Sequence, residues 1–222
     1  MGVLLMLMTI GGVIVAGILL AVSIFTKRTW LTKFTFGGVA VWFAFYAVML
    51  FGYSFASSDK VLALNAPKSF CGFYLDCHMH TAVTGVRTAK TIGSEAANGI
   101  FYIAKVKVFS DARNPNIAFR LLEPNAEVLD ANGVRYIRNI SAEALLPTGS
   151  VQLGEDIKGK QTIEKELVFD VPDAAAGLRL LITEGYGIDK YIEAVLIDDE
   201  DSIMHKRNYF ELREQNTTAG VK

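Results

Sequence analysis

The chain has 222 residues, of which 51% are hydrophobic, and its formal net charge is −1. A chain this close to neutrality lacks the basic field that attracts a nucleic-acid backbone, so we expect no nucleic-acid partner. Much of the hydrophobic excess lies at the N-terminal end. About 160 residues follow it, enough for one domain with its own core.

Two apolar runs near the N-terminus, Val3–Phe25 and Phe36–Ala56, contain no charged residue. As helices, each is long enough to cross about 30 Å of hydrocarbon. Between them, residues 26–33 form a short stretch that contains Lys27, Arg28 and Lys33. Short basic loops stay in the cytoplasm. We therefore expect a two-pass transmembrane hairpin in the lipid bilayer over residues 1–58, with helices at about 3–25 and 36–56 and both ends extracytoplasmic.

Two other interpretations of these runs are a cleaved signal peptide and a buried helical hairpin of a soluble protein. A signal peptide carries basic residues before its apolar core, and Met1-Gly2 supplies none. A core helix at a protein surface shows a polar stripe, which neither run has. Cleavage of the first helix would leave one anchor and the same final compartment.

Residues 59–70 are expected to form a linker, 71–213 an extracytoplasmic domain and 214–222 a flexible tail. Within the domain the apolar pattern has period two. Alternating strands are expected at 73–83, 99–109, 117–121, 126–129, 134–137, 163–171, 178–183 and 191–197, with an Asn132-Gly133 step that favours a tight hairpin. A single helical turn is expected at Ser141–Leu146, capped by Ser141. About eight strands at this spacing predict an all-β sandwich behind the two helices.

Several short motifs add a family resemblance. They are Ala104-Lys105-Val106-Lys107-Val108, Asp130-Ala131-Asn132-Gly133, Leu153-Gly154-Glu155, Gly159-Lys160 and Phe169-Asp170-Val171-Pro172. With these motifs, the segment from Ile100 to about Ile197 resembles the bacterial extracytoplasmic immunoglobulin-like domains of unknown function found on membrane-anchored proteins and lipoproteins. The resemblance implies an immunoglobulin-like sandwich and assigns no chemistry.

The segment Cys71–His80 holds both cysteines and two of the three histidines. In an oxidising compartment, Cys71 and Cys77 are expected to form a disulfide that closes a small loop. The alternative is a metal site with His78, His80 and Met79 as ligands. Histidines at i and i+2 of a strand lie side by side, and a set that includes sulfur favours copper. The two alternatives compete, because an oxidised cysteine does not bind metal as a thiolate.

The sequence shows no nucleophile–base spacing of the known catalytic motifs, so we expect no enzyme. Gly154–Lys160 matches the spacing of a phosphate-binding loop, but Gln161 follows it and the next segment is strand-like. The function expected is therefore that of an interaction or structural module with an envelope or membrane protein as partner. The alternative is a protein that handles copper or another metal through residues 71–80.

Overall fold

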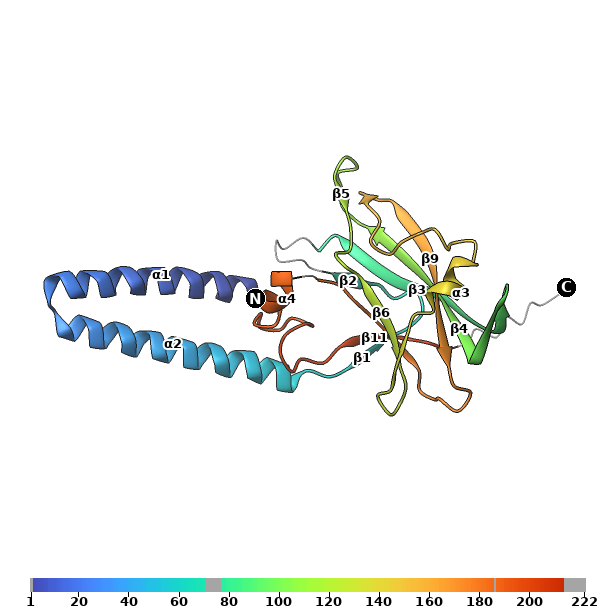
Figure 1. Ribbon diagram of the computed structural model, residues 1–222. Coiled ribbons are helices and arrows are strands. Elements are labelled where there is room, and N and C mark those ends of the chain that lie inside the picture. Colours follow the sequence, from blue (N-terminus) through green and yellow to red (C-terminus); the bar gives the residue numbers. More distant parts are fainter. Residues whose placement is uncertain (1, 71–76, 186, 214–222) are drawn as a thin grey trace. The chain divides into compact units, whose positions relative to one another are not determined.

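The computed structural model describes residues 2–70, 77–185 and 187–213. These residues form two compact units. One unit contains residues 2–58 and 188–207, and the other contains residues 59–187 and the segment from Asn208 onward. An N-terminal pair of apolar helices followed by a β-sandwich confirms the predicted fold class (Figure 1).

The first unit is built on helices α1 (Gly2–Thr26) and α2 (Thr29–Ala56). Lys27, with φ of 51°, ends α1 in the left-handed region. The amide of Arg28 donates to the carbonyl of Ser23 at 3.1 Å, which completes a Schellman motif. Because so few residues suffice to reverse the chain, α2 begins at Thr29 rather than at the predicted Phe36.

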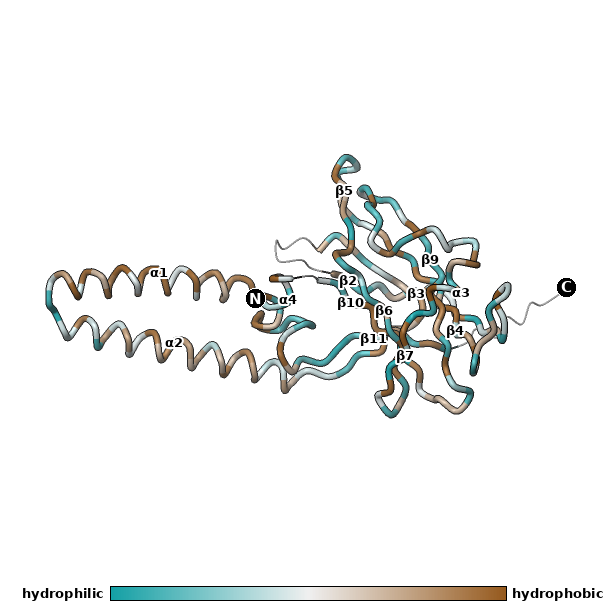
Figure 2. The backbone as a smooth tube through the Cα atoms, viewed as in Figure 1, coloured by the Kyte–Doolittle hydropathy of each residue, from teal (hydrophilic) through white to brown (hydrophobic). Residues whose placement is uncertain are grey.

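The helices are joined by side-chain hydrogen bonds near the turn and about halfway along α2. The indole Nε1 of Trp42 donates to Thr9 Oγ1 at 3.0 Å, and the hydroxyls of Ser23 and Thr32 lie 2.6 Å apart. Along both helices the chain is coloured mostly brown to white, the hydrophobic to neutral part of the scale (Figure 2). Most of their apolar side chains are exposed, including Val41 at 71%.

The second unit contains a five-stranded sheet in the order β1-β11-β10-β6-β7 and a four-stranded sheet in the order β2-β3-β4-β9. The strands of the first sheet are β1 (Lys60–Leu62), β6 (Asn125–Leu129), β7 (Arg135–Ile137), β10 (Arg179–Thr183) and β11 (Asn208–Glu211). Those of the second are β2 (Lys68–Phe70), β3 (Met79–Ile92), β4 (Glu95–Ser110) and β9 (Thr162–Val171). A short pair, β5 (Ala118–Phe119) with β8 (Ile157–Lys158), lies outside both sheets.

The core lies between the two sheets and follows the predicted alternation. Val106 and Val108 of β4 pack in one cluster with Phe169 of β9, and with Val128 and Phe210 from the other sheet. Lys105 and Lys107 alternate with them on the outer face. A second cluster on the outer side of β4 contains Phe101, Ile103, Ile92, Val168 and Ala142.

The segment predicted as a linker, residues 59–70, contains two edge strands of the sandwich. β1 pairs in parallel with β11, and β2 pairs antiparallel with β3. The strand predicted at 73–83 is observed as β3, which starts at Met79 and continues to a two-residue turn at Gly93-Ser94. Residues 71–76 and the tail predicted at 214–222 lie outside the described residues.

Two predictions of secondary structure were wrong. The segment 191–197 is not a strand, because α4 (Gly187–Glu193) occupies its first part and turns follow. The helical turn α3 (Ile140–Ala144) is capped by Asn139 rather than Ser141, with Asn139 Oδ1 accepting from the Ala142 amide at 3.0 Å. The Asn132-Gly133 turn joins β6 and β7 as expected, with Gly133 at a φ of 80°.

Candidate functional site

The two predicted histidine ligands lie against one carboxylate at the start of β3. His78 Nδ1 is 2.7 Å from Asp111 Oδ1, and His80 Nε2 is 3.3 Å from Asp111 Oδ2. The strand pairing explains this convergence, because His80 is opposite Phe109 and the Asp111 amide donates to the His78 carbonyl. The hydrogen bond from His78 and the other contacts with the two imidazoles hold the pKa of Asp111 below its ordinary value.

His80 has protein groups at both ring nitrogens. Its Nδ1 lies 2.9 Å from Ser69 Oγ, and its buried Nε2 lies 3.3 Å from Asp111 Oδ2, within ion-pair distance. Its ring stacks on Phe109 with centroids 5.1 Å apart, and the His78 ring meets Phe119 edge-on at 5.7 Å. A metal ion at His80 would therefore have to displace one of these polar partners.

The other predicted ligands are placed differently. Met79 is buried in the core between the sheets, on the face of β3 opposite to His78 and His80. Cys77 is exposed, whereas Cys71 lies outside the described residues, so the disulfide stays a prediction. Within the described part of the chain, no group of three His, Cys, Asp or Glu side chains has an arrangement that could hold a metal ion.

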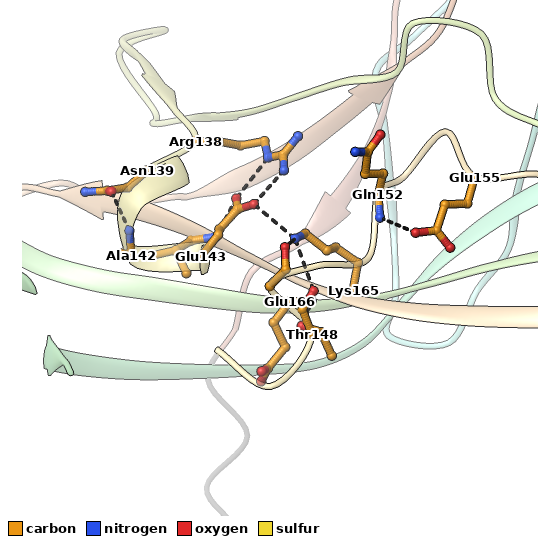
Figure 3. Close-up of polar contacts among 11 residues, drawn as sticks. Arg138, Asn139, Ala142, Glu143, Thr148, Gln152, Glu155, Lys165 and Glu166 are labelled. Atoms are coloured by element: carbon orange, nitrogen blue, oxygen red, sulfur yellow. Dashed lines mark hydrogen bonds and ion pairs between the residues drawn. The ribbon is translucent and has the colours of Figure 1, made fainter. Parts of the chain in front are cut away.

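A cleft of about 760 Å³ opens on the sandwich beside α3. Residues 120–124, residues 149–154 and three residues of α3 form its walls, and Arg138, Glu143 and Lys165 lie among its lining residues. Figure 3 shows these three side chains pointing toward one another; Lys165 belongs to β9, Glu143 to α3, and Arg138 follows β7 directly. Sequence reasoning missed this site.

Glu143 is the centre of a buried ionic network. Only 2% of its side chain is exposed. Arg138 binds it with both ends of its guanidinium, Nε to Oε1 at 2.9 Å and Nη2 to Oε2 at 2.5 Å. The Val168 amide also donates to Oε1 at 3.1 Å. Together these donors compensate for removing the carboxylate from water.

Lys165 completes the network from the middle of β9. Its Nζ lies 3.7 Å from Glu143 Oε2 and donates to the backbone carbonyls of Thr148 at 3.2 Å and Gly149 at 3.1 Å. These bonds fix the segment 148–149 beside the cleft. The cationic groups of Arg138 and Lys165 are thus engaged by the protein itself, and Arg120 and Glu123 supply exposed charges at the rim.

Among the described residues that line this cleft there is no Cys and no His. Apolar side chains are exposed along the neighbouring chain, with Ile137 at 80% and Ile140 at 60%. A fixed polar wall next to exposed apolar side chains suits non-covalent binding of another molecule.

Asp130 fixes the tight turn between β6 and β7 of the five-stranded sheet. Its Oδ1 accepts from the amides of Asn132 at 2.8 Å and Val134 at 2.9 Å, and its Oδ2 accepts from the Tyr136 hydroxyl at 3.2 Å. Burial by itself would raise the pKa of Asp130, but these donations outweigh it and lower the pKa. The role of this carboxylate is to hold the turn between β6 and β7.

No family model matches the sequence, and no curated protein matches it. Among solved structures, the chain is similar to MPT63, a secreted protein from Mycobacterium tuberculosis, with a TM-score of 0.42 and 13% identity over 60% of this chain and 92% of that one. It is also similar to a conserved hypothetical protein from Bacillus anthracis, with a TM-score of 0.41 and 12% identity over 55% of this chain and 90% of that one. A third is an uncharacterized β-sandwich protein from Clostridium difficile 630, with a TM-score of 0.37 and 8% identity over 71% of this chain and 96% of that one. These likenesses are distant, and no function is drawn from them.

Proposed function

We propose that the protein is a membrane-anchored, extracytoplasmic β-sandwich that acts as an interaction or structural module in the cell envelope or a membrane complex. One observation carries the proposal. The helices α1 and α2, of 25 and 28 residues, pair with each other and leave most of their apolar side chains without protein cover. At 1.5 Å per residue both exceed about 30 Å, the thickness of the hydrocarbon core.

Burial distinguishes this proposal from the alternative of a soluble core hairpin. In the most apolar stretch of each helix, only 6% of residues in α1 and 11% in α2 are buried. Exposed apolar surface of this extent is unfavourable in water and favourable in lipid.

The bonds between α1 and α2 favour a retained first helix over a cleaved signal peptide. Trp42 donates to Thr9, and the Ser23 and Thr32 hydroxyls bond to each other. In hydrocarbon such polar side chains gain most when they bond to a partner across the helix pair. The basic residues Lys27, Arg28 and Lys33 at the hairpin turn favour a cytoplasmic turn, which makes the sandwich extracytoplasmic.

The cleft beside α3 supports the interaction role. Its wall is fixed by the Glu143 network, and Ile137 and Ile140 expose apolar surface next to it. Exposed apolar side chains bordered by polar residues mark surfaces that bind other proteins. We place the partner contact there.

Crosslinking in native membranes, followed by purification of the full chain, tests the proposal. We expect Arg120→Glu, at the rim of the cleft, to reduce recovery of the crosslinked partner. Arg113→Glu is the matched control, since Arg113 is also exposed but does not line the cleft. Equal recovery with both variants would place the contact elsewhere, and no crosslinked protein with the wild type would contradict the interaction role.

A second candidate, a protein that handles copper or another metal, is favoured by the convergence of His78 and His80 on Asp111. Metal analysis of protein purified without chelator, together with a count of free thiols, separates the two. Stoichiometric metal that is lost in His78→Ala would support this candidate, and metal-free protein with both cysteines bridged would end it.

A further inference from the structure

The segment 188–207 lies far from the hairpin in sequence and yet belongs to the same compact unit. We call it the clasp segment. The Tyr46 hydroxyl donates to the Val195 carbonyl at 2.7 Å, and the Lys206 amide donates to Ser57 Oγ at 2.9 Å. The backbone of Ile197 approaches Gly2 so closely that a side chain at position 2 would not fit. The clasp segment is therefore held against the N-terminal end of α1 and the C-terminal part of α2.

The place of Tyr46 along α2 gives the depth of this contact. Tyr46 is 13 positions beyond Lys33, the last basic residue of the hairpin turn. At 1.5 Å per residue this corresponds to about 20 Å along the helix. The hydrocarbon core is about 30 Å thick. With the basic turn at its cytoplasmic boundary, the Val195 carbonyl lies in the outer half of the core.

The bond from Tyr46 has a physical reason at that depth. A backbone carbonyl without a donor costs several kcal/mol in hydrocarbon. Val195 lies in the turns after α4. Because the helix has ended there, its carbonyl does not receive the hydrogen bond that a continuing helix would supply from a backbone amide. The phenol of Tyr46 supplies the donor from within an otherwise apolar helix.

The clasp segment turns large apolar side chains outward. Ile188 is 70% exposed and Tyr191 is 77% exposed, and Val195 is also exposed. Their spacing of three and four residues places them on one side of α4 and the turn after it. Farther along, Ile203 and Met204 are exposed as well. A segment with a Tyr and aliphatic side chains on its outer side fits the boundary between headgroups and acyl chains.

Two pairs of oppositely charged side chains form within the segment. Arg207 forms an ion pair with Asp201, and His205 lies 4.0 Å from Asp198. For Asp198 and Asp201, these partners lower the cost of placing a carboxylate near a lipid surface.

We infer that the clasp segment is a third membrane contact of this protein, inserted into the outer leaflet through Ile188, Tyr191, Val195, Ile203 and Met204 and held there by Tyr46. This inference rests on the proposed membrane anchoring. The occupant of the surface is lipid, because the contact with Tyr46 lies along the stretch of α2 that spans the bilayer.

Spin labels on the full chain test the inference, after reconstitution into phosphatidylcholine–phosphatidylglycerol vesicles with Cys71 and Cys77 replaced by Ser. The label is placed in turn at Tyr191→Cys, Met204→Cys, Val41→Cys in α2 and Ile137→Cys on the sandwich. We expect Tyr191→Cys and Met204→Cys to collide more with oxygen than with a water-soluble nickel complex, as Val41→Cys does. Ile137→Cys, an equally exposed apolar position on β7, should show the opposite order.

The outcomes separate this inference from the proposed function. A lipid-like label at Val41→Cys with water-like labels at Tyr191→Cys and Met204→Cys would overturn the inference and leave the anchor intact. A water-like label at Val41→Cys would overturn both.

The role of Tyr46 has its own test. Added to Tyr191→Cys, Tyr46→Phe should shift the label toward water, because the Val195 carbonyl loses its donor. Tyr53→Phe, in the same helix, is the matched control and should leave the label in place. An unchanged label in Tyr46→Phe would overturn the role assigned to this hydroxyl.

Discussion

Replacement of Glu143 by Gln tests whether the ionic network holds the wall of the cleft. The variant keeps the shape of the side chain but removes the charge that compensates Arg138 and Lys165, which are 22% and 4% exposed. Removing one partner from a buried ion pair costs about 3–5 kcal/mol. Because Arg138 keeps some contact with water, we expect the lower end, about 3 kcal/mol.

Amide hydrogen exchange at Val168 measures this cost directly, since the Val168 amide donates to Glu143. Tryptophan fluorescence would not report on it, because both tryptophans, Trp30 and Trp42, lie in α2. A loss of about 3 kcal/mol corresponds to exchange that is faster by roughly two powers of ten.

Glu164→Gln is the matched control, because Glu164 pairs with Lys105 at 2.7 Å and both side chains are nearly half exposed. An exposed pair contributes about 0–1 kcal/mol, so exchange should change by less than about fivefold. Glu143→Leu combined with Arg138→Met should recover part of the lost stability at the other amides of β9, because no guanidinium is then left unpaired, although the Val168 amide itself loses its acceptor. Equal effects of Glu143→Gln and Glu164→Gln would refute the reasoning.

The remaining predictions concern one turn, one carboxyl group and the cysteine pair. Asp130→Ala should speed amide exchange in β6 and β7, and protection in the wild type should be lost as the pH falls through the lowered pKa of Asp130, because the protonated carboxyl accepts these bonds poorly. Burial, followed by the charge of Glu200, raises the pKa of Asp199 to about 6. The protonated form is therefore favoured in the folded clasp segment, so protection should decrease between about pH 4 and pH 6 as the pH rises and stay constant above, and Asp199→Asn should remove this dependence. Mass spectrometry after alkylation should find Cys71 and Cys77 bridged in protein from the envelope, and reactive thiols with bound metal would favour the alternative.

The elements that sequence patterns predicted well are those determined by local contacts. The charge-free runs at residues 3–25 and 36–56 gave α1 and most of α2, and the alternation of Val106 and Val108 with Lys105 and Lys107 gave the two faces of β4. The Asn132-Gly133 turn was confirmed for the same reason, because a positive φ at Gly133 is a local requirement.

The elements that were missed depend on contacts between distant residues. β1 is short and has neighbours only because β11 pairs with it from the other end of the chain. In β3, irregular pairing near Gly85 and Lys90 interrupts the period of two, which concealed its continuation to Ile92. The apolar residues after Gly187 fit both a period of two and the helical period, so the pattern did not separate strand from helix, and α4 forms there.

In the histidine cluster and in the cleft, too, the local features were predictable and the contacts between distant residues were not. The i and i+2 spacing placed His78 and His80 on one side of the chain at the start of β3, but their shared partner Asp111 directly follows β4, the strand that pairs with β3. The Glu143 network joins three elements, and only the five-residue separation of Arg138 and Glu143 is local. No sequence pattern reports that Lys165 reaches Glu143 across the cleft wall.

The central claim is that the hairpin stays in the membrane with its basic turn in the cytoplasm and the sandwich outside. Alkaline phosphatase, which is active only outside the cytoplasm, tests it most directly when fused after Lys222 and, in a second fusion, after Trp30. The account predicts an active fusion at Lys222 and an inactive fusion at Trp30. Activity at Trp30 with none at Lys222 would contradict this claim. The same result would also contradict the proposed envelope partner and the contact of the clasp segment with the outer leaflet.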